Sequence, residues 1–232
     1  MNGRLGRVQS SIIPEVAQYL EIHPKDPQPR LLRQAVDRLR DGGVIAYPTD
    51  SCYALGCRIG DKTALERIRR IRQADKNHHF TLVCRDLSEI ARYARVDTPQ
   101  FRLLKACTPG PYTFLLEATR ETPRILQHPK RRTIGIRVPD HPVPRALLGL
   151  LDEPILSSTL QLPGDELPLN DGAGIRERLD RELDVILDAG HCGLEPTTVV
   201  DLAVSPPQVL RQGRGDLAPF GAAAHAPILR GP

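Results

Sequence analysis

Hydrophobic positions along this chain alternate between helical and strand-like spacing. Between residues 30 and 40, apolar residues recur at the spacing of one helix face, and Gly42 and Gly43 then favour a helix end. The apolar run 44–47 that follows predicts a buried strand, ended by Pro48. Helical segments and short apolar runs continue to alternate up to about residue 211, which predicts an α/β protein.

The expected elements are mixed along the whole chain. Helices are expected over 30–40, 62–73, 86–93, 98–106, 143–151 and 174–181. Strands are expected over 17–22, 44–47, 80–84, 112–118, 133–138, 154–158, 184–187, 197–202 and 208–211. We therefore predict a single domain over residues 17–217 with one twisted, mixed sheet. Residues 1–16 are expected to be a flexible N-terminal extension and 218–232 a mobile C-terminal tail.

Composition narrows the class of protein. With 40% apolar and 26% charged residues in 232 positions, the chain is typical of globular proteins, and its net charge of +4 is modest. The five cysteines follow no regular spacing, so a disulfide framework is not predicted and reduced thiols are expected. No apolar run has the length of a signal peptide core or of a spanning helix, so a cytoplasmic protein is expected.

Three segments are candidates for binding chemistry, although neither Gly-x-Gly-x-x-Gly nor a Walker loop is present. In the first, Pro48 to Gly56, hydroxyl, carboxylate and phenol groups follow a strand end, where open α/β sheets place ligands. An ordinary turn with Asp50 bonded to its own backbone is an equal alternative.

The second candidate is a basic stretch at the end of the helix over 62–73. Its four arginines occupy six positions and cannot share one face, so at most two or three converge on one anion, and a solvated basic surface is favoured about two to one. The residues are Arg67, Arg69, Arg70 and Arg72, followed by Lys76, His78 and His79.

The third candidate is the strand within residues 131–139. Arg131, Thr133, Gly135 and Arg137 alternate onto one face of it, opposite Ile134, Ile136 and Val138. An arginine inside such a strand requires an anion or a carboxylate partner, which favours a binding role. Histidine and cysteine spacings do not predict a zinc site, and Ser157 and Ser158 have no identifiable base.

Together, five segments in order resemble motifs of the YrdC-like family, the threonylcarbamoyl-AMP synthases of tRNA modification. Residues 48–56 resemble its Pro-Thr-[Asp/Glu]-Thr-x-Tyr-Gly-Leu-Gly opening, and 109–113 its Pro-Gly-Pro-x-Thr turn. Residues 133–141 resemble Thr-x-x-x-Arg-x-Pro-x-His, 196–201 Ser-Thr-Val-Val-Asp, and 209–213 Leu-Arg-x-Gly. Segments 22–24, 71–73 and 80–88 look specifically like the YciO-like branch.

The resemblance implies an α/β domain with a basic cleft that binds L-threonine, bicarbonate and ATP with Mg²⁺. It further implies that threonine amine captures carbon dioxide or bicarbonate, and that the resulting carbamate displaces pyrophosphate from ATP. Ser51, Arg137 and Thr197 match positions that hold threonine. Positions near the nucleotide are matched by Arg72, Thr133, Thr159, Gln161 and Arg211, and no metal-ligating residue is expected.

The chain departs from the family pattern at two places on the nucleotide side. The Lys-x-Arg pair of the family falls on Arg72-Gln73-Ala74, which retains one positive charge. Lys76 or His78 could partly substitute for the other. The Ser-x-Asn pattern becomes Thr159-Leu160-Gln161, which keeps hydroxyl and amide chemistry on longer or branched side chains.

A second function of a different class is a non-catalytic module that binds double-stranded RNA or tRNA through the same basic cleft. The net charge of +4 and nine aromatic residues would then leave recognition to shape and phosphate contacts, with strong salt dependence. Pyrophosphate release that requires threonine and bicarbonate separates the two functions.

Overall fold

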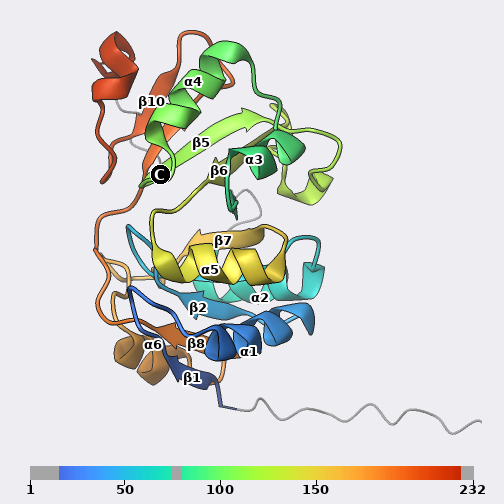
Figure 1. The fold of residues 1–232 in the computed structure, drawn as a ribbon, viewed down its shortest axis with the longest axis vertical. Coiled ribbons are helices and arrows are strands. Elements are labelled where there is room, and N and C mark those ends of the chain that lie inside the picture. Colours follow the sequence, from blue (N-terminus) through green and yellow to red (C-terminus); the bar gives the residue numbers. More distant parts are fainter. Residues whose placement is uncertain (1–15, 75–79, 226–232) are drawn as a thin grey trace, which may run out of the picture.

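The computed structural model describes residues 16–74 and 80–225 and contains one ten-stranded sheet (Figure 1). Its strand order is β1-β8-β2-β3-β7-β4-β6-β5-β9-β10. The strands are β1 (Gln18–Glu21), β2 (Ile45–Tyr47), β3 (Ala54–Arg58), β4 (Thr81–Val83), β5 (Tyr112–Glu117), β6 (Thr133–Arg137), β7 (Ile155–Thr159), β8 (Val185–Asp188), β9 (Thr198–Asp201) and β10 (Gln208–Arg211). The sheet is mixed, as predicted, because β1–β8, β2–β8, β4–β6 and β5–β9 are parallel pairs and the others are antiparallel.

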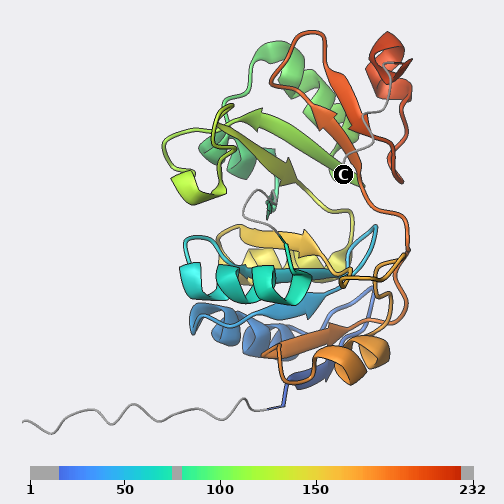
Figure 2. The same ribbon diagram turned by 180° about the vertical axis from the view of Figure 1, so that it is seen from behind.

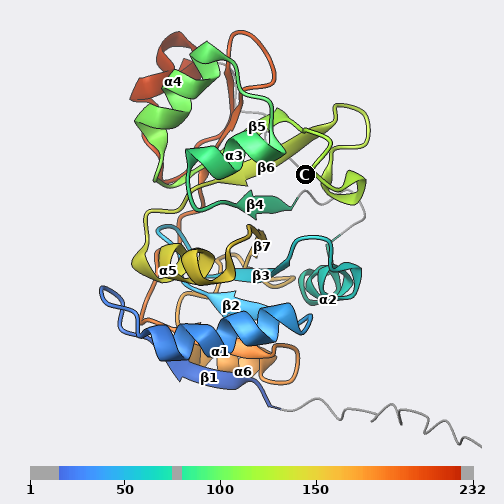
Figure 3. The same ribbon diagram turned by 45° about the vertical axis from the view of Figure 1, so that its right-hand side comes forward.

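Helices cover the two faces of the sheet unequally. The α-helices are α1 (Pro29–Arg40), α2 (Lys62–Arg72), α3 (Leu87–Tyr93), α4 (Thr98–Cys107), α5 (Pro142–Leu151) and α6 (Gly172–Leu179), with short 3₁₀ segments at Arg124–Leu126 and Ala218–His225. Helices α1 and α5 lie together in front of the strands in the lower part of the view (Figure 3), and their buried residues belong to one hydrophobic cluster. Seen from behind, α2 and α6 lie over the lower strands, whereas no described α-helix lies over β5 and β6 (Figure 2).

Helix α2 shows how local sequence places a site residue. Its first turn is capped by the Asp61 carboxylate, which accepts a 2.9 Å hydrogen bond from the Ala64 N–H. Leu65 and Ile68 are buried against the sheet, which fixes the rotation of the helix about its axis. Gln73 then adopts a left-handed conformation that ends the helix directly after Arg72.

Strand β3 corrects the expectation of a loop from Pro48 to Gly56. Only the residues before Ala54 form a loop, and Ala54–Arg58 is a strand between β2 and β7. Its first four residues are all buried, because helices cover both faces of this part of the sheet. A short strand buried on both faces has no alternating pattern by which the sequence could reveal it.

The segment expected to be a tail is partly packed. Phe220 is only 7% exposed, and its ring lies 5.9 Å from that of Tyr112 and 6.5 Å from that of Phe114. The ordered part of the fold therefore extends beyond residue 217. Of the expected N-terminal extension, only Val16 is among the described residues. Residues 226–232 of the expected tail also lie outside them.

Within the described ranges, none of the helices combines the length and the hydrophobicity needed to cross a bilayer.

Candidate functional site

A cavity of about 340 Å³ lies on the sheet face that α3 and α4 leave uncovered, beside the end of α2. Its floor is a row of residues in register across neighbouring strands. Thr81 is paired with Ser157 on one side and Gly135 on the other, and Gly135 is paired in turn with Leu115. Register partners point to the same face of a sheet, so this row forms one continuous surface.

Gly135 lies at the centre of this floor and has no side chain that would project into the cavity. A Cβ atom built there would lie 3.3 Å from Thr81 Oγ1 and 3.5 Å from Thr113 Cγ2. A larger side chain would project into the cavity from the middle of its base. The absence of a side chain therefore contributes directly to the room available for a ligand.

Arg137 is the most buried cation that lines the cavity. Its side chain and that of Asp50 are each 9% exposed, and its Nη2 group donates to Asp50 Oδ1. The Nη1 group donates to Ser51 Oγ at 3.2 Å, while Nε is buried without a hydrogen-bond partner. A buried N–H group without a partner is costly. The sequence predicts an anion or a carboxylate partner for this strand arginine, and the structure shows a carboxylate, Asp50, from the loop after β2.

Arg72 and Arg211 line the same cavity without such compensation. The Arg72 Nη1 group donates to the backbone oxygen of Gln161, and its Nε is buried without a partner. No carboxylate among the described residues forms an ion pair with either arginine. Desolvation by the surrounding protein lowers the pKa of both guanidinium groups, as expected for cations that lack an anionic partner.

Hydroxyl groups complete the site near Arg211. Thr197 Oγ1 lies 2.9 Å from Thr113 Oγ1, and the Thr197 backbone oxygen accepts hydrogen bonds from Arg211 Nε and Nη2 at 3.2 and 3.0 Å. These contacts connect the loop before β9 with β5 and β10. Ser51 and Thr197, two of the three positions expected to hold threonine, thus line one cavity with the third, Arg137.

Not all of the residues expected near the nucleotide lie in the cavity. Arg72, Thr159, Gln161 and Arg211 line the cavity, whereas Thr133 does not. Thr133 lies two positions before Gly135 on the same face of β6, at its first residue, where it is paired with Glu117 at the end of β5. Lys76 and His78 lie outside the described residues.

Gln161 uses its amide to hold its own loop. Its Nε2 group donates to the backbone oxygen of Asp165 at 2.9 Å and to that of Glu166 at 3.3 Å. The substitution of glutamine for the family asparagine is therefore accompanied by side-chain bonds that stay within the protein.

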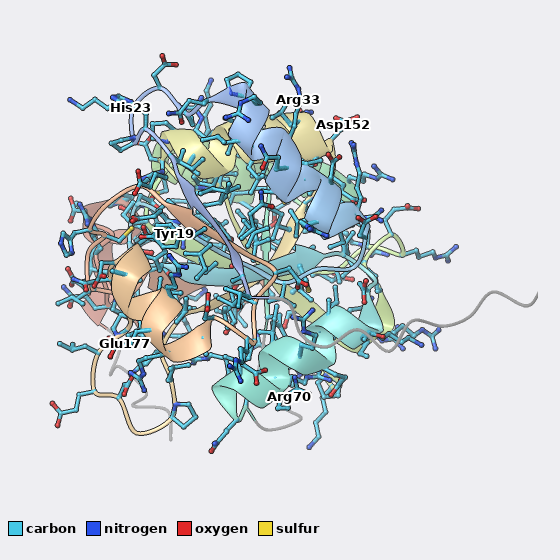
Figure 4. All side chains as sticks on the ribbon, turned by 90° about the horizontal axis from the view of Figure 1, so that it is seen from below. Tyr19, His23, Arg33, Arg70, Asp152 and Glu177 are labelled. Carbon is cyan, nitrogen blue, oxygen red and sulfur yellow. The ribbon has the colours of Figure 1, made fainter. Side chains whose placement is uncertain are left out.

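The basic face of α2 does not converge on the cavity, but the solvated surface favoured from the sequence is found only at Arg70, because Arg67 and Arg69 are largely covered. Arg67 forms an ion pair with Asp184 at 2.7 Å, and Arg69 pairs with Glu66 and lies over the Phe80 ring. Arg70 projects at the surface of the helix (Figure 4) and pairs with Glu182. Arg72 is the one arginine of this group that reaches the cavity.

Sequence reasoning missed several residues of the cavity floor. Thr81, Ser157 and Ser158 line the cavity, but the sequence points to the two serines only as possible nucleophiles and gives no signal for Thr81. The Ser157 hydroxyl accepts a hydrogen bond from Tyr47 OH at 2.8 Å and donates one to the Leu55 backbone oxygen at 3.1 Å. Both bonds lie within the protein, so this hydroxyl stabilises the cavity floor. Strand register, which local pattern does not reveal, would have been needed to find this row.

The lining suits positioning and charge stabilisation rather than proton transfer. No aspartate, glutamate or histidine lines the cavity among the described residues. Burial raises the pKa of the Cys52 thiol to about 11, so at neutral pH this group is not a thiolate nucleophile. In the described ranges there is also no cluster of three acidic, histidine or cysteine side chains that could hold a metal ion.

Comparisons with known proteins show the family of this chain. The model of the family described as Telomere recombination, which covers Sua5, YciO and YrdC, matches residues 37–213. The uncharacterized protein YciO of Escherichia coli (strain K12) is 54% identical over 205 residues, which are 88% of this chain and all of that protein. A threonylcarbamoyl-AMP synthase of Chromobacterium violaceum is 33% identical over 182 residues, 77% of this chain and 92% of that one.

Solved structures give the same picture of the fold. The crystal structure of E. coli YciO has a TM-score of 0.85 and covers 88% of this chain and 99% of that chain, with 54% identity. That of P. abyssi Sua5 complexed with L-threonine has a TM-score of 0.78, 24% identity, and covers 84% of this chain and 57% of the other.

Proposed function

Because this chain belongs to the Sua5/YciO/YrdC family, we propose that it is a threonylcarbamoyl-AMP synthase that acts on L-threonine, bicarbonate and Mg²⁺·ATP. The observation that carries the proposal is the presence of three arginines in one cavity whose described lining has no acidic side chain. Such a lining favours substrates that bear carboxylate and phosphate groups.

Arg137 and Ser51 are assigned to the threonine carboxylate. The Arg137 guanidinium lines the cavity as a candidate donor to the carboxylate, and the Ser51 hydroxyl lies beside its Nη1 group. Thr113 on β5 and Thr197 in the loop before β9 offer paired hydroxyls for the remaining polar groups. These contacts orient the amino group for its reaction with bicarbonate.

Arg72 and Arg211 are assigned to the phosphates. The threonine amine forms an N–C bond with bicarbonate, and water leaves, which gives a carbamate. A carbamate oxygen then bonds to the α-phosphorus of ATP as the bond to pyrophosphate breaks. The two arginines stabilise negative charge on the phosphate oxygens, and the cavity holds the reacting groups together. Mg²⁺ would enter with ATP as part of the substrate, so the cavity would not need a carboxylate cage to hold it.

A test of the proposal measures pyrophosphate release with all three substrates and after omission of threonine or bicarbonate. Release that requires both supports the synthase, whereas release independent of threonine, or none at all, contradicts it. Arg72→Met should lower kcat/KM for ATP by about 10- to 150-fold, the equivalent of about 1.5–3 kcal/mol for hydrogen bonds to charged groups.

Arg70→Met is the matched control for this variant. Arg70 is on the same helix, but its side chain is 68% exposed and pairs with Glu182 at the surface. Its substitution should leave kcat/KM for ATP within about twofold of the value for the unmodified protein, because Arg70 does not line the cavity and exposed ion pairs contribute little to stability. Equal losses in the two variants would refute the assignment of Arg72 to the phosphates.

A further inference from the structure

Positive charge in the cavity is compensated at one arginine and uncompensated at the other two. Arg137 forms its ion pair with Asp50, whereas Arg72 and Arg211 have no carboxylate at ion-pair distance among the described residues. A phosphate group therefore gains less electrostatic energy beside Arg137 than beside the other two arginines. The difference in charge compensation comes from one side chain, Asp50, which does not itself line the cavity.

The Asp50 carboxylate is held from two directions. Oδ1 accepts from Arg137 Nη2, and Oδ2 accepts a 3.1 Å hydrogen bond from the Asp140 backbone N–H. Because both oxygens are engaged and the side chain is 9% exposed, its charge is fixed beside the guanidinium. The Nε–H of Arg137 is the buried donor of this group that remains without a partner.

We propose that Asp50 is a positioning residue that sorts the two substrates by charge. By compensating Arg137, it keeps that arginine suitable for the carboxylate of an amino acid and unattractive to a polyphosphate, which is directed to Arg72 and Arg211. This inference rests on the proposed function, because it gives a specific reason why threonine and ATP occupy different parts of one cavity.

Calorimetry with inorganic pyrophosphate and L-threonine tests the inference without turnover. In the unmodified protein, saturating pyrophosphate should change the threonine Kd by less than about twofold, and one pyrophosphate should bind per chain. In Asp50→Asn, which removes the charge but keeps the shape, pyrophosphate should also bind at Arg137. Its stoichiometry should rise to two, and it should raise the threonine Kd at least about tenfold.

Two further variants separate charge from structure. Asp50→Glu restores the carboxylate and should return the behaviour of the unmodified protein. Asp201→Asn alters another buried carboxylate that is paired with an arginine, Arg131, outside the cavity, and it should leave pyrophosphate stoichiometry and competition unchanged. A purely structural role of Asp50 would weaken threonine binding equally with and without pyrophosphate, which would overturn the inference.

The outcomes also separate this inference from the proposed function. If the unmodified protein does not bind threonine, the synthase assignment fails, while the pyrophosphate stoichiometry of Asp50→Asn still decides the role of Asp50. If threonine-dependent turnover is present but pyrophosphate stoichiometry and competition are unchanged in Asp50→Asn, the charge-sorting role is wrong. If Asp50→Asn does not fold, Asp50→Ser is the second variant without the charge. Displacement of threonine by pyrophosphate from the unmodified protein would by itself overturn the inference.

Discussion

The ion pair between Asp50 and Arg137 should contribute strongly to stability as well as to binding. Replacement of Arg137 by methionine leaves Asp50 Oδ1 without its cation, although Oδ2 keeps the hydrogen bond from the Asp140 N–H. Both side chains are 9% exposed, so water replaces the lost partner poorly. We expect Arg137→Met to lower the free energy of unfolding by about 3–5 kcal/mol, the usual result when one member of a buried pair is removed.

The double variant Asp50→Asn/Arg137→Met provides the decisive comparison. It removes both charges, so its loss should be smaller than the sum of the two single losses, with a coupling energy of about 2 kcal/mol. Urea unfolding at neutral pH measures each value, and the exposed Arg70→Met should change stability by no more than about 0.5 kcal/mol. A loss below about 1 kcal/mol in Arg137→Met, or strict additivity in the double variant, would refute the reasoning.

The remaining predictions concern the cavity, one helix cap and the C-terminal packing. Ala74→Arg, which restores the family charge, should tighten ATP binding by about 1–3 kcal/mol in calorimetry; an unchanged Kd would count against a phosphate site there. Gly135→Val should fill the cavity floor and abolish threonine binding in a protein that still folds, at a stability cost of about 1–3 kcal/mol. Burial lowers the pKa of His141, so the unfolded state binds the proton more tightly, and stability should fall as pH decreases below about 6.5. His141→Asn, which can retain the helix cap, should show a smaller fall in urea midpoints between neutral and acidic pH. Phe220→Ala should lower the free energy of unfolding by about 3 kcal/mol, whereas a change under about 0.5 kcal/mol would show that residues after 217 are dispensable.

Much of the fold could be predicted because most elements have one buried face. Helix α2, for example, has a cap at Asp61 and apolar residues at helical spacing, and both signals lie within a dozen residues. Strand β3 lacks such a signal, since its residues are buried on both faces and it contains Gly56. The alanines and prolines around Phe220 show no period and so predict a tail, whereas in the structure its ring packs beside those of Tyr112 and Phe114.

The candidate site was predictable in its residues but not in its contacts. The buried strand position of Arg137 already required an anionic partner, and the loop with Asp50 was a separate candidate. These two candidates are 87 positions apart in the sequence, and they form one site because of the order of the strands, which local pattern does not encode. For the same reason, the sequence could not show that β6 brings Gly135 to the cavity floor while Thr133 lies beyond it.

The two departures from the family pattern lie on the nucleotide side of the cavity, and the structure connects them. Arg72, the cation that is retained from the Lys-x-Arg pair, donates to the backbone of Gln161, whose side chain in turn holds the loop up to Glu166. The end of α2 and this loop are therefore one bonded unit, stabilised by contacts within the protein. By contrast, Arg137 keeps the arginine of the family motif, and Ser51 keeps a hydroxyl group where the motif has threonine. Under the proposed function, we expect these changes to act first on the affinity for ATP, and we expect recognition of an amino acid carboxylate to be the better preserved property.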